Sequence, residues 1–112
     1  MQIESRITGR LGVAVVKTDR IDAAAAPELR LAVLPVLLGM EQVILDLSSV
    51  TFMDETGLGA ILSLLNVRQG PRTLAISGAA GQVETLFRLT HMNKIFPMYR
   101  NQGDAEQALA AA

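Results

Sequence analysis

The most constraining feature of the sequence is the stretch from Gln42 to Gln69, which reads as a strand, a short connection and a helix in immediate succession. Residues 43–47 form a short apolar run with β-branched side chains, and such a run is typical of a buried strand. Over residues 56–68, leucine and isoleucine recur at intervals of three and four, which predicts a helix. The strand shows little polar alternation, so we expect it to lie in the centre of a sheet.

The junction between this strand and this helix has an unusual local chemistry. Thr56 is preceded by Asp54 and Glu55 and followed by Gly57, at the point where the helix should begin. One interpretation is that Asp54 or Thr56 is a helix cap, which stabilises the helix by roughly 1 kcal/mol. The other is that the Thr56 hydroxyl is exposed for modification. Gly57 is expected to allow a close approach of another backbone segment.

The spacing also predicts which side of this helix is buried. The residues expected to face the sheet are Leu58, Ile61, Leu62 and Leu65, while Leu64 lies off that stripe. Met53, Leu58 and Leu64 are candidates for an exposed apolar rim that contacts a partner. Core packing is the competing interpretation for each of them.

The rest of the chain continues the alternation of strands and helices. Alternating or β-branched runs predict further strands at residues 3–7, 11–17, 72–77 and 95–99, the last at an edge because of Pro97. Further helices are expected from the alanines at 23–26 to Gly39, over 82–89, and over 104–111 with Asp104 as its cap. The order β-β-α-β-α-β-α-β-α predicts an α/β fold with a mixed sheet of about five strands and helices mainly over one face.

Composition excludes several classes of function. The chain has 112 residues, which fits a single domain over 1–112, and a net charge of −1 that provides no field to attract nucleic acid. The absence of cysteine excludes a disulfide scaffold, a thiolate zinc site and a thiol nucleophile. A single histidine offers no cluster for a metal. We therefore expect no metal, no cofactor and no catalytic residues.

Localisation can be predicted from the apolar stretches. The first residues lack the apolar core of a signal peptide. The longest apolar stretch, residues 31–40, is too short to span a bilayer and is broken by Pro35. We expect a cytoplasmic protein without direct membrane insertion.

Several segments together resemble the STAS domain, named for sulphate transporters and anti-sigma factor antagonists. They cover nearly the whole chain: DRIDA at 19–23, ILDL at 44–47, VTFMD at 50–54, TGLG at 56–59, and LFRLT through IF at 86–96. The resemblance implies the mixed sheet predicted above. Among such domains, stand-alone chains of this length are most similar to anti-sigma factor antagonists.

That resemblance implies a mechanism of partner switching. The unmodified domain binds an anti-sigma factor, often a serine/threonine protein kinase, which phosphorylates the acceptor and thereby ends the complex, and a phosphatase resets it. By the motif, the acceptor is Thr56, and the implied partner-binding residues are Asp22, Met53, Asp54, Glu55, Thr56, Gly57 and Leu58. An alternative is a STAS subunit of a transport or sensory complex that is not phosphorylated. An enzyme using Asp54, Thr56 and His91 has no base at a known catalytic spacing.

Three positions depart from the family pattern. Glu55 stands where serine is usual, Asp19 replaces a glycine, and His91 stands where a helix-ending glycine is common. The charge of Glu55 either leaves Thr56 as an acceptor or replaces part of the phosphate's effect. The expected edge strands at 3–7 and 95–99 could also pair between copies, which would give a homodimer.

Overall fold

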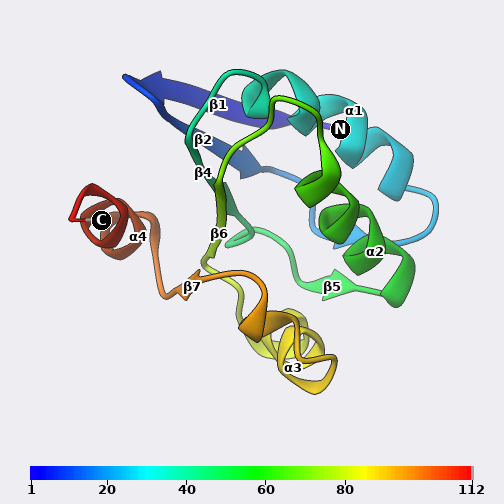
Figure 1. Ribbon diagram of the computed structural model, residues 1–112. Coiled ribbons are helices and arrows are strands. Elements are labelled where there is room, and N and C mark those ends of the chain that lie inside the picture. The colour runs from blue at the N-terminus through cyan, green and yellow to red at the C-terminus, as the bar shows by residue number, and fades with distance from the viewer. Residues whose placement is uncertain (112) are drawn as a thin grey trace.

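A computed structural model describes residues 1–111 and contains the predicted mixed sheet (Figure 1). Its strand order is β1-β2-β4-β6-β7, in which only the β1–β2 pair is antiparallel. The strands are β1 (Ile3–Thr8), β2 (Leu11–Val16), β4 (Gln42–Asp46), β6 (Thr73–Ser77) and β7 (Met98–Tyr99). β4 lies in the centre of the sheet, as its apolar sequence predicted, and both of its faces are covered.

The helices lie on both faces of this sheet, three on one and one on the other (Figure 1). They are α1 (Ala26–Leu37), α2 (Glu55–Ser63), α3 (Gly81–Leu89) and α4 (Gln102–Ala110). The larger core joins the first three helices to the sheet, through residues such as Leu29, Ile61 and Phe87. The smaller core packs Ala105 and Leu109 of α4 on the opposite face. The expectation of helices mainly over one face is confirmed.

A second, very small sheet was not predicted. β3 (Arg20–Ile21) pairs in parallel with β5 (Phe52–Met53). Two residues are too few to show the alternation by which a strand is recognised in a sequence. The pair places the segment that leads into α1 beside the segment that leads into α2.

The predicted buried stripe of α2 is wrong at its end. Leu64 is 1% exposed and Leu65 is 42% exposed, the reverse of the expectation. The cause is a change of helix type, because α2 ends at Ser63 and a 3-10 helix, η1 (Leu64–Asn66), follows. With about three residues per turn, Leu64 lies directly below Ile61 and enters the core.

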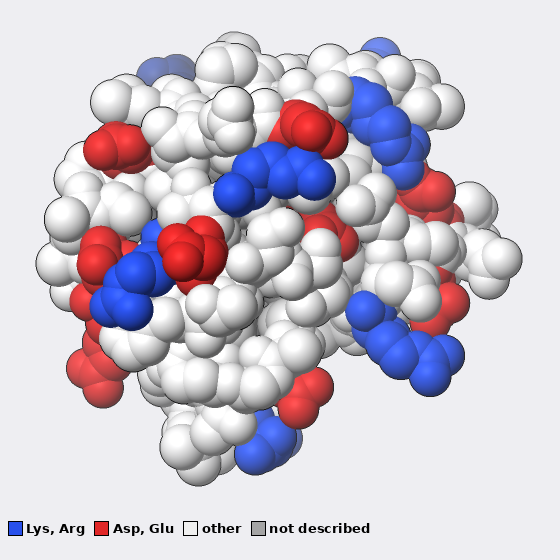
Figure 2. All heavy atoms as spheres, turned by 180° about the vertical axis from the view of Figure 1, so that it is seen from behind, with Lys and Arg blue, Asp and Glu red and all other residues white. Residues whose placement is uncertain are grey.

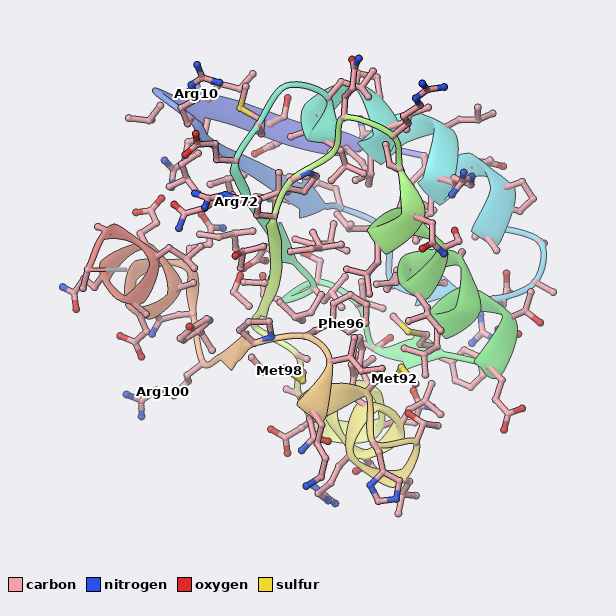
Figure 3. The ribbon with its side chains drawn as sticks, viewed as in Figure 1. Arg10, Arg72, Met92, Phe96, Met98 and Arg100 are labelled. Atoms are coloured by element: carbon pink, nitrogen blue, oxygen red, sulfur yellow. The ribbon has the colours of Figure 1, made fainter. Side chains whose placement is uncertain are left out.

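The strand predicted at 95–99 is shorter than expected. A 3-10 helix, η2 (Met92–Lys94), precedes it, and only Met98 and Tyr99 pair with β6. Phe96 instead points into the core, where its ring meets that of Phe87 edge to face, with centroids 6.0 Å apart (Figure 3). The edge position of β7 is confirmed.

The start of the last helix also differs from the prediction. α4 begins at Gln102, and its cap is Asn101, whose side chain accepts a hydrogen bond from the Asp104 N–H at 2.8 Å. Asp104 therefore lies inside the first turn and is not the cap. Ala105 and Leu109 are buried, as the sequence predicted. Within residues 1–111, no helix is long and apolar enough to cross a membrane.

Candidate functional site

The start of α2 is held by one carboxylate that bonds in two directions. Asp54 has an extended backbone, and its Oδ1 accepts from the Gly57 N–H at 2.8 Å, which is the geometry of a helix cap. Its Oδ2 accepts from the Ala23 N–H at 3.1 Å. The capping role expected of Asp54 is therefore confirmed. The same side chain also ties the loop before α1 to the helix.

Gly57 lies where α2 touches the small sheet. It is buried, and a Cβ atom at this position would stand 2.1 Å from the carbonyl oxygen of Ile21. No side chain larger than hydrogen fits without a shift of the backbone. This confirms that the glycine allows a close backbone approach.

A side chain from α3 supports the strand before the helix. The Gln82 Oε1 accepts from the Met53 N–H at 2.9 Å, and its Nε2 donates to the Met53 carbonyl at 2.7 Å. Both backbone groups of Met53 are thereby satisfied by one amide. No sequence pattern indicated this role, because a glutamine in the first turn of a helix is usually solvated.

The loop before α1 is joined to the same strand segment. The Asp19 carbonyl accepts from the Thr51 N–H at 2.8 Å and from the Thr51 hydroxyl at 3.1 Å. The Arg20 guanidinium lies 4.3 Å from the centre of the Phe52 ring. Asp22 is half-buried and accepts from the Ala25 N–H at 3.1 Å, so it caps the turn that enters α1.

Thr56 and Glu55 are exposed on this braced helix start. The expected apolar rim is wrong, since Met53, Leu58 and Leu64 are 0%, 5% and 1% exposed. All three side chains belong to the main core, so the Met53 side chain is not available to a partner.

A groove runs along one side of α2, from Glu55 to Leu62. Its volume is about 310 Å³, and its lining residues are Glu55, Leu58, Gly59, Leu62, Thr90 and Met92. Met92 lies between α2 and α3 (Figure 3). The surface beside Glu55 is thus partly apolar, although the Leu58 side chain contributes little exposed area.

The remaining polar residues singled out by the sequence have structural positions. Asp46 is 2% exposed and accepts from the Ser48 N–H at 3.0 Å and the Ser77 hydroxyl at 2.6 Å, which ties two strand ends together. His91 has a positive φ of 62° and is exposed, which explains why glycine suits this position. No group of three or more potential metal ligands occurs among residues 1–111.

Comparison with known proteins decides the family. A model of the STAS domain matches residues 2–105. The chain belongs to the STAS domain family. It is 30% identical over 107 residues to an anti-sigma-B factor antagonist of Listeria monocytogenes, covering 93% of this chain and 91% of that protein.

Solved structures share the fold. An anti-sigma factor antagonist from Mycobacterium paratuberculosis superposes with a TM-score of 0.82 at 23% identity, over 96% of this chain and 92% of the other. The phosphorylated form of the Bacillus cell fate determinant SpoIIAA gives a TM-score of 0.64 at 15% identity, over 96% and 99% of the two chains. This STAS chain therefore shares its fold with these solved structures.

Proposed function

We propose that this STAS domain is an anti-sigma factor antagonist that binds an anti-sigma factor with serine/threonine kinase activity. Phosphorylation of Thr56 ends the complex, and a phosphatase restores binding. The observation that carries the proposal is an exposed hydroxyl on a helix start whose backbone is fixed by Asp54 and Gly57. The Listeria relative and the phosphorylated form of SpoIIAA support it.

The proposed contact surface has an exposed part and a supporting part. Thr56 and Glu55 are exposed on α2, and the adjacent Ala23 is joined to them through Asp54. Asp22 and Asp54 hold the two loops in place, and Gly57 fixes the distance between them. The groove beside Glu55 offers a place for an apolar side chain of the partner.

A phosphate on Thr56 changes this surface without refolding it. The group carries about −1.5 to −2 charges at neutral pH and is favoured by the positive end of the helix. Asp54 and Glu55 oppose it, so its effect on the stability of the free domain is small. At a packed interface the same charge loses water, and a penalty of about 4 kcal/mol weakens binding roughly 1,000-fold.

The test mixes this chain with a candidate anti-sigma factor kinase and ATP, and maps the phosphate by mass spectrometry. We expect a single phosphate on Thr56 and release of the complex. Thr56→Ala should bind normally but resist release by ATP, and Thr56→Glu should bind at least about tenfold more weakly. Absence of phosphate on Thr56, or equal binding by both variants, would favour an interaction subunit that is not phosphorylated.

Glu55 is the residue that tunes this reaction. Its exposed carboxylate neighbours the acceptor and repels the incoming γ-phosphate by about 1 kcal/mol. Glu55→Ser should therefore raise the rate of Thr56 phosphorylation about fivefold. Glu84→Ser, which removes an exposed acid from the first turn of α3, is the matched control and should leave the rate unchanged. Equal rates in wild type and Glu55→Ser would show that the charge has no such effect.

A further inference from the structure

The outer edge of β1 has the features of a pairing surface. β1 is the first strand in the sheet order, and every residue from Glu4 to Thr8 is exposed. Its six residues pair with β2 in an unbroken register without a bulge, and the strand contains no proline. Proteins usually protect an edge strand with a bulge or a proline, because its free backbone groups can otherwise bind another strand. β1 lacks both.

The backbone of β1 shows which groups are free. Lys17 N–H donates to the Gln2 carbonyl at 3.0 Å, so Gln2 and Lys17 form a hydrogen-bonded pair. In an antiparallel ladder the bonded positions alternate, and Glu4 and Arg6 therefore also direct their backbone groups to β2. The N–H and carbonyl groups of the intervening residues, Ile3, Ser5 and Ile7, point to the free edge.

The sequence of the edge is complementary to itself. We propose that two copies of this chain pair antiparallel through β1, with Ser5 opposite Ser5 of the second copy. In this register Ile3 lies opposite Ile7, and Glu4 lies opposite Arg6. The backbone groups of Ile3, Ser5 and Ile7, which face the free edge, then all bond to the same set of residues in the second copy. The neighbouring registers with the same bonding pattern would put Glu4 opposite Glu4 or Arg6 opposite Arg6. Like charges directly opposite each other are unfavourable.

The charges behind this edge extend the match. Glu4 lies 3.8 Å from Lys17 within the chain, and Arg6 is paired with Glu106 of α4. Across the proposed interface the row would read Lys17, Glu4, then Arg6 and Glu106 of the second copy, with the sign alternating at each step. Figure 2, which views the molecule from behind, shows basic and acidic side chains next to one another at several places on this face. The charges therefore favour the same register as the backbone.

The other face of the strand gains apolar burial. Ile7 is 59% exposed, although Ile3 at the other end of the strand packs against the main core. In the proposed pair each Ile7 lies beside an Ile3 of the second copy, and cross-strand apolar pairs of this kind stabilise sheets. The result is a continuous sheet across two copies. No residue of this edge belongs to the Thr56 surface, so the pairing can be tested independently of the proposed function.

Sedimentation equilibrium over a range of concentrations tests the pairing. We expect wild type to dimerise, and either Glu4→Arg or Arg6→Glu alone to raise the dissociation constant at least about tenfold, because each change alters both symmetric charge pairs. An equal mixture of the two single variants should restore the dimer, since their strands carry opposite charges. The double variant Glu4→Arg/Arg6→Glu restores both charge pairs between the copies and should dimerise more tightly than either single variant, although it places like charges beside Lys17 and Glu106. Rescue in the mixture also shows that both variants are folded.

A second pair of variants tests the backbone bonds. Ser5→Pro removes an N–H that faces the free edge and should yield a monomer, while Ser5→Ala keeps it and should leave the dimer intact. Circular dichroism checks the fold of both. A wild-type chain that stays monomeric at about 1 mM, or single charge variants that dimerise as well as wild type, would overturn the proposal.

Discussion

The starts of α2 and α3 both follow a strand, β5 and β6 respectively, yet they are built differently. α2 begins at an aspartate that caps it, whereas α3 has no side-chain capping bond at Ala80. Each also relies on a glycine, for different reasons. Gly57 is required because a backbone touches it, and Gly81 has a positive φ of 55° with open space around it.

The difference shows where the structural support is concentrated. The polar side chain at the start of α3, Gln82, does not serve its own helix but holds the strand before α2. The start of α2 is thus fixed by its own cap and by a neighbouring helix. Thr56 is exposed on a segment whose backbone is held by these contacts, so the proposed phosphate would alter the surface while the fold stays the same.

The largest effect should come from filling the contact at α2. Gly57→Ala places a Cβ atom against the Ile21 carbonyl and should destabilise the protein by about 3 kcal/mol or more. Gly59→Ala in the same helix is the control. It meets no atom within 4 Å and should stabilise the protein by about 0.5–1 kcal/mol. Urea denaturation compares the two, and similar stabilities would show that the close approach is not rigid.

Removal of the α2 cap should have the next largest effect. Asp54→Ala loses the bonds to the Gly57 and Ala23 N–H groups and should cost about 2 kcal/mol. Asp54→Asn keeps one acceptor oxygen and should cost about half as much. Thermal unfolding measures both. If Asp54→Asn were as stable as wild type, the bond to Ala23 would have no separate role.

At the start of α3, the cost of a substitution should come from backbone strain and not from a close contact. Gly81→Ala forces an alanine into a left-handed conformation, at a cost of about 1–2 kcal/mol. Gly81→Asn should cost less, because asparagine tolerates this conformation. The same denaturation experiment applies, and an alanine variant as stable as wild type would contradict the assigned conformation.

The smallest effect is expected at the link between the two helix starts. Gln82→Ala removes two hydrogen bonds to Met53, but the glutamine is exposed, so the cost should be about 1 kcal/mol. Hydrogen exchange gives a sharper result, since the Met53 amide should lose protection while amides in β4 keep theirs. Unchanged exchange at Met53 would show that the amide is held by other contacts.

The sequence alone predicted most of the elements and the position of the candidate site. Apolar runs of five or six residues and helical spacing are strong signals, so the central strand, the hairpin and the four helices were found. The cap at Asp54 followed from residue type and position, and the close approach at Gly57 followed from the absence of a side chain. These features depend on residues that are close together in the chain, so the sequence pattern predicts them directly.

Tertiary structure alone decided the rest. Three features join residues about thirty positions apart, and no local pattern specifies them: the β3–β5 pair, the hydrogen bonds of Gln82 to Met53 and the hydrogen bond from Ala23 to Asp54. The burial of Leu64 in place of Leu65 depended on a change to a 3-10 turn. Met53 was expected at the surface and lies in the core, because its strand is covered by α3. The sequence determined where Thr56 lies along the chain, and packing between distant segments determined that its backbone is held rigidly while its side chain is exposed.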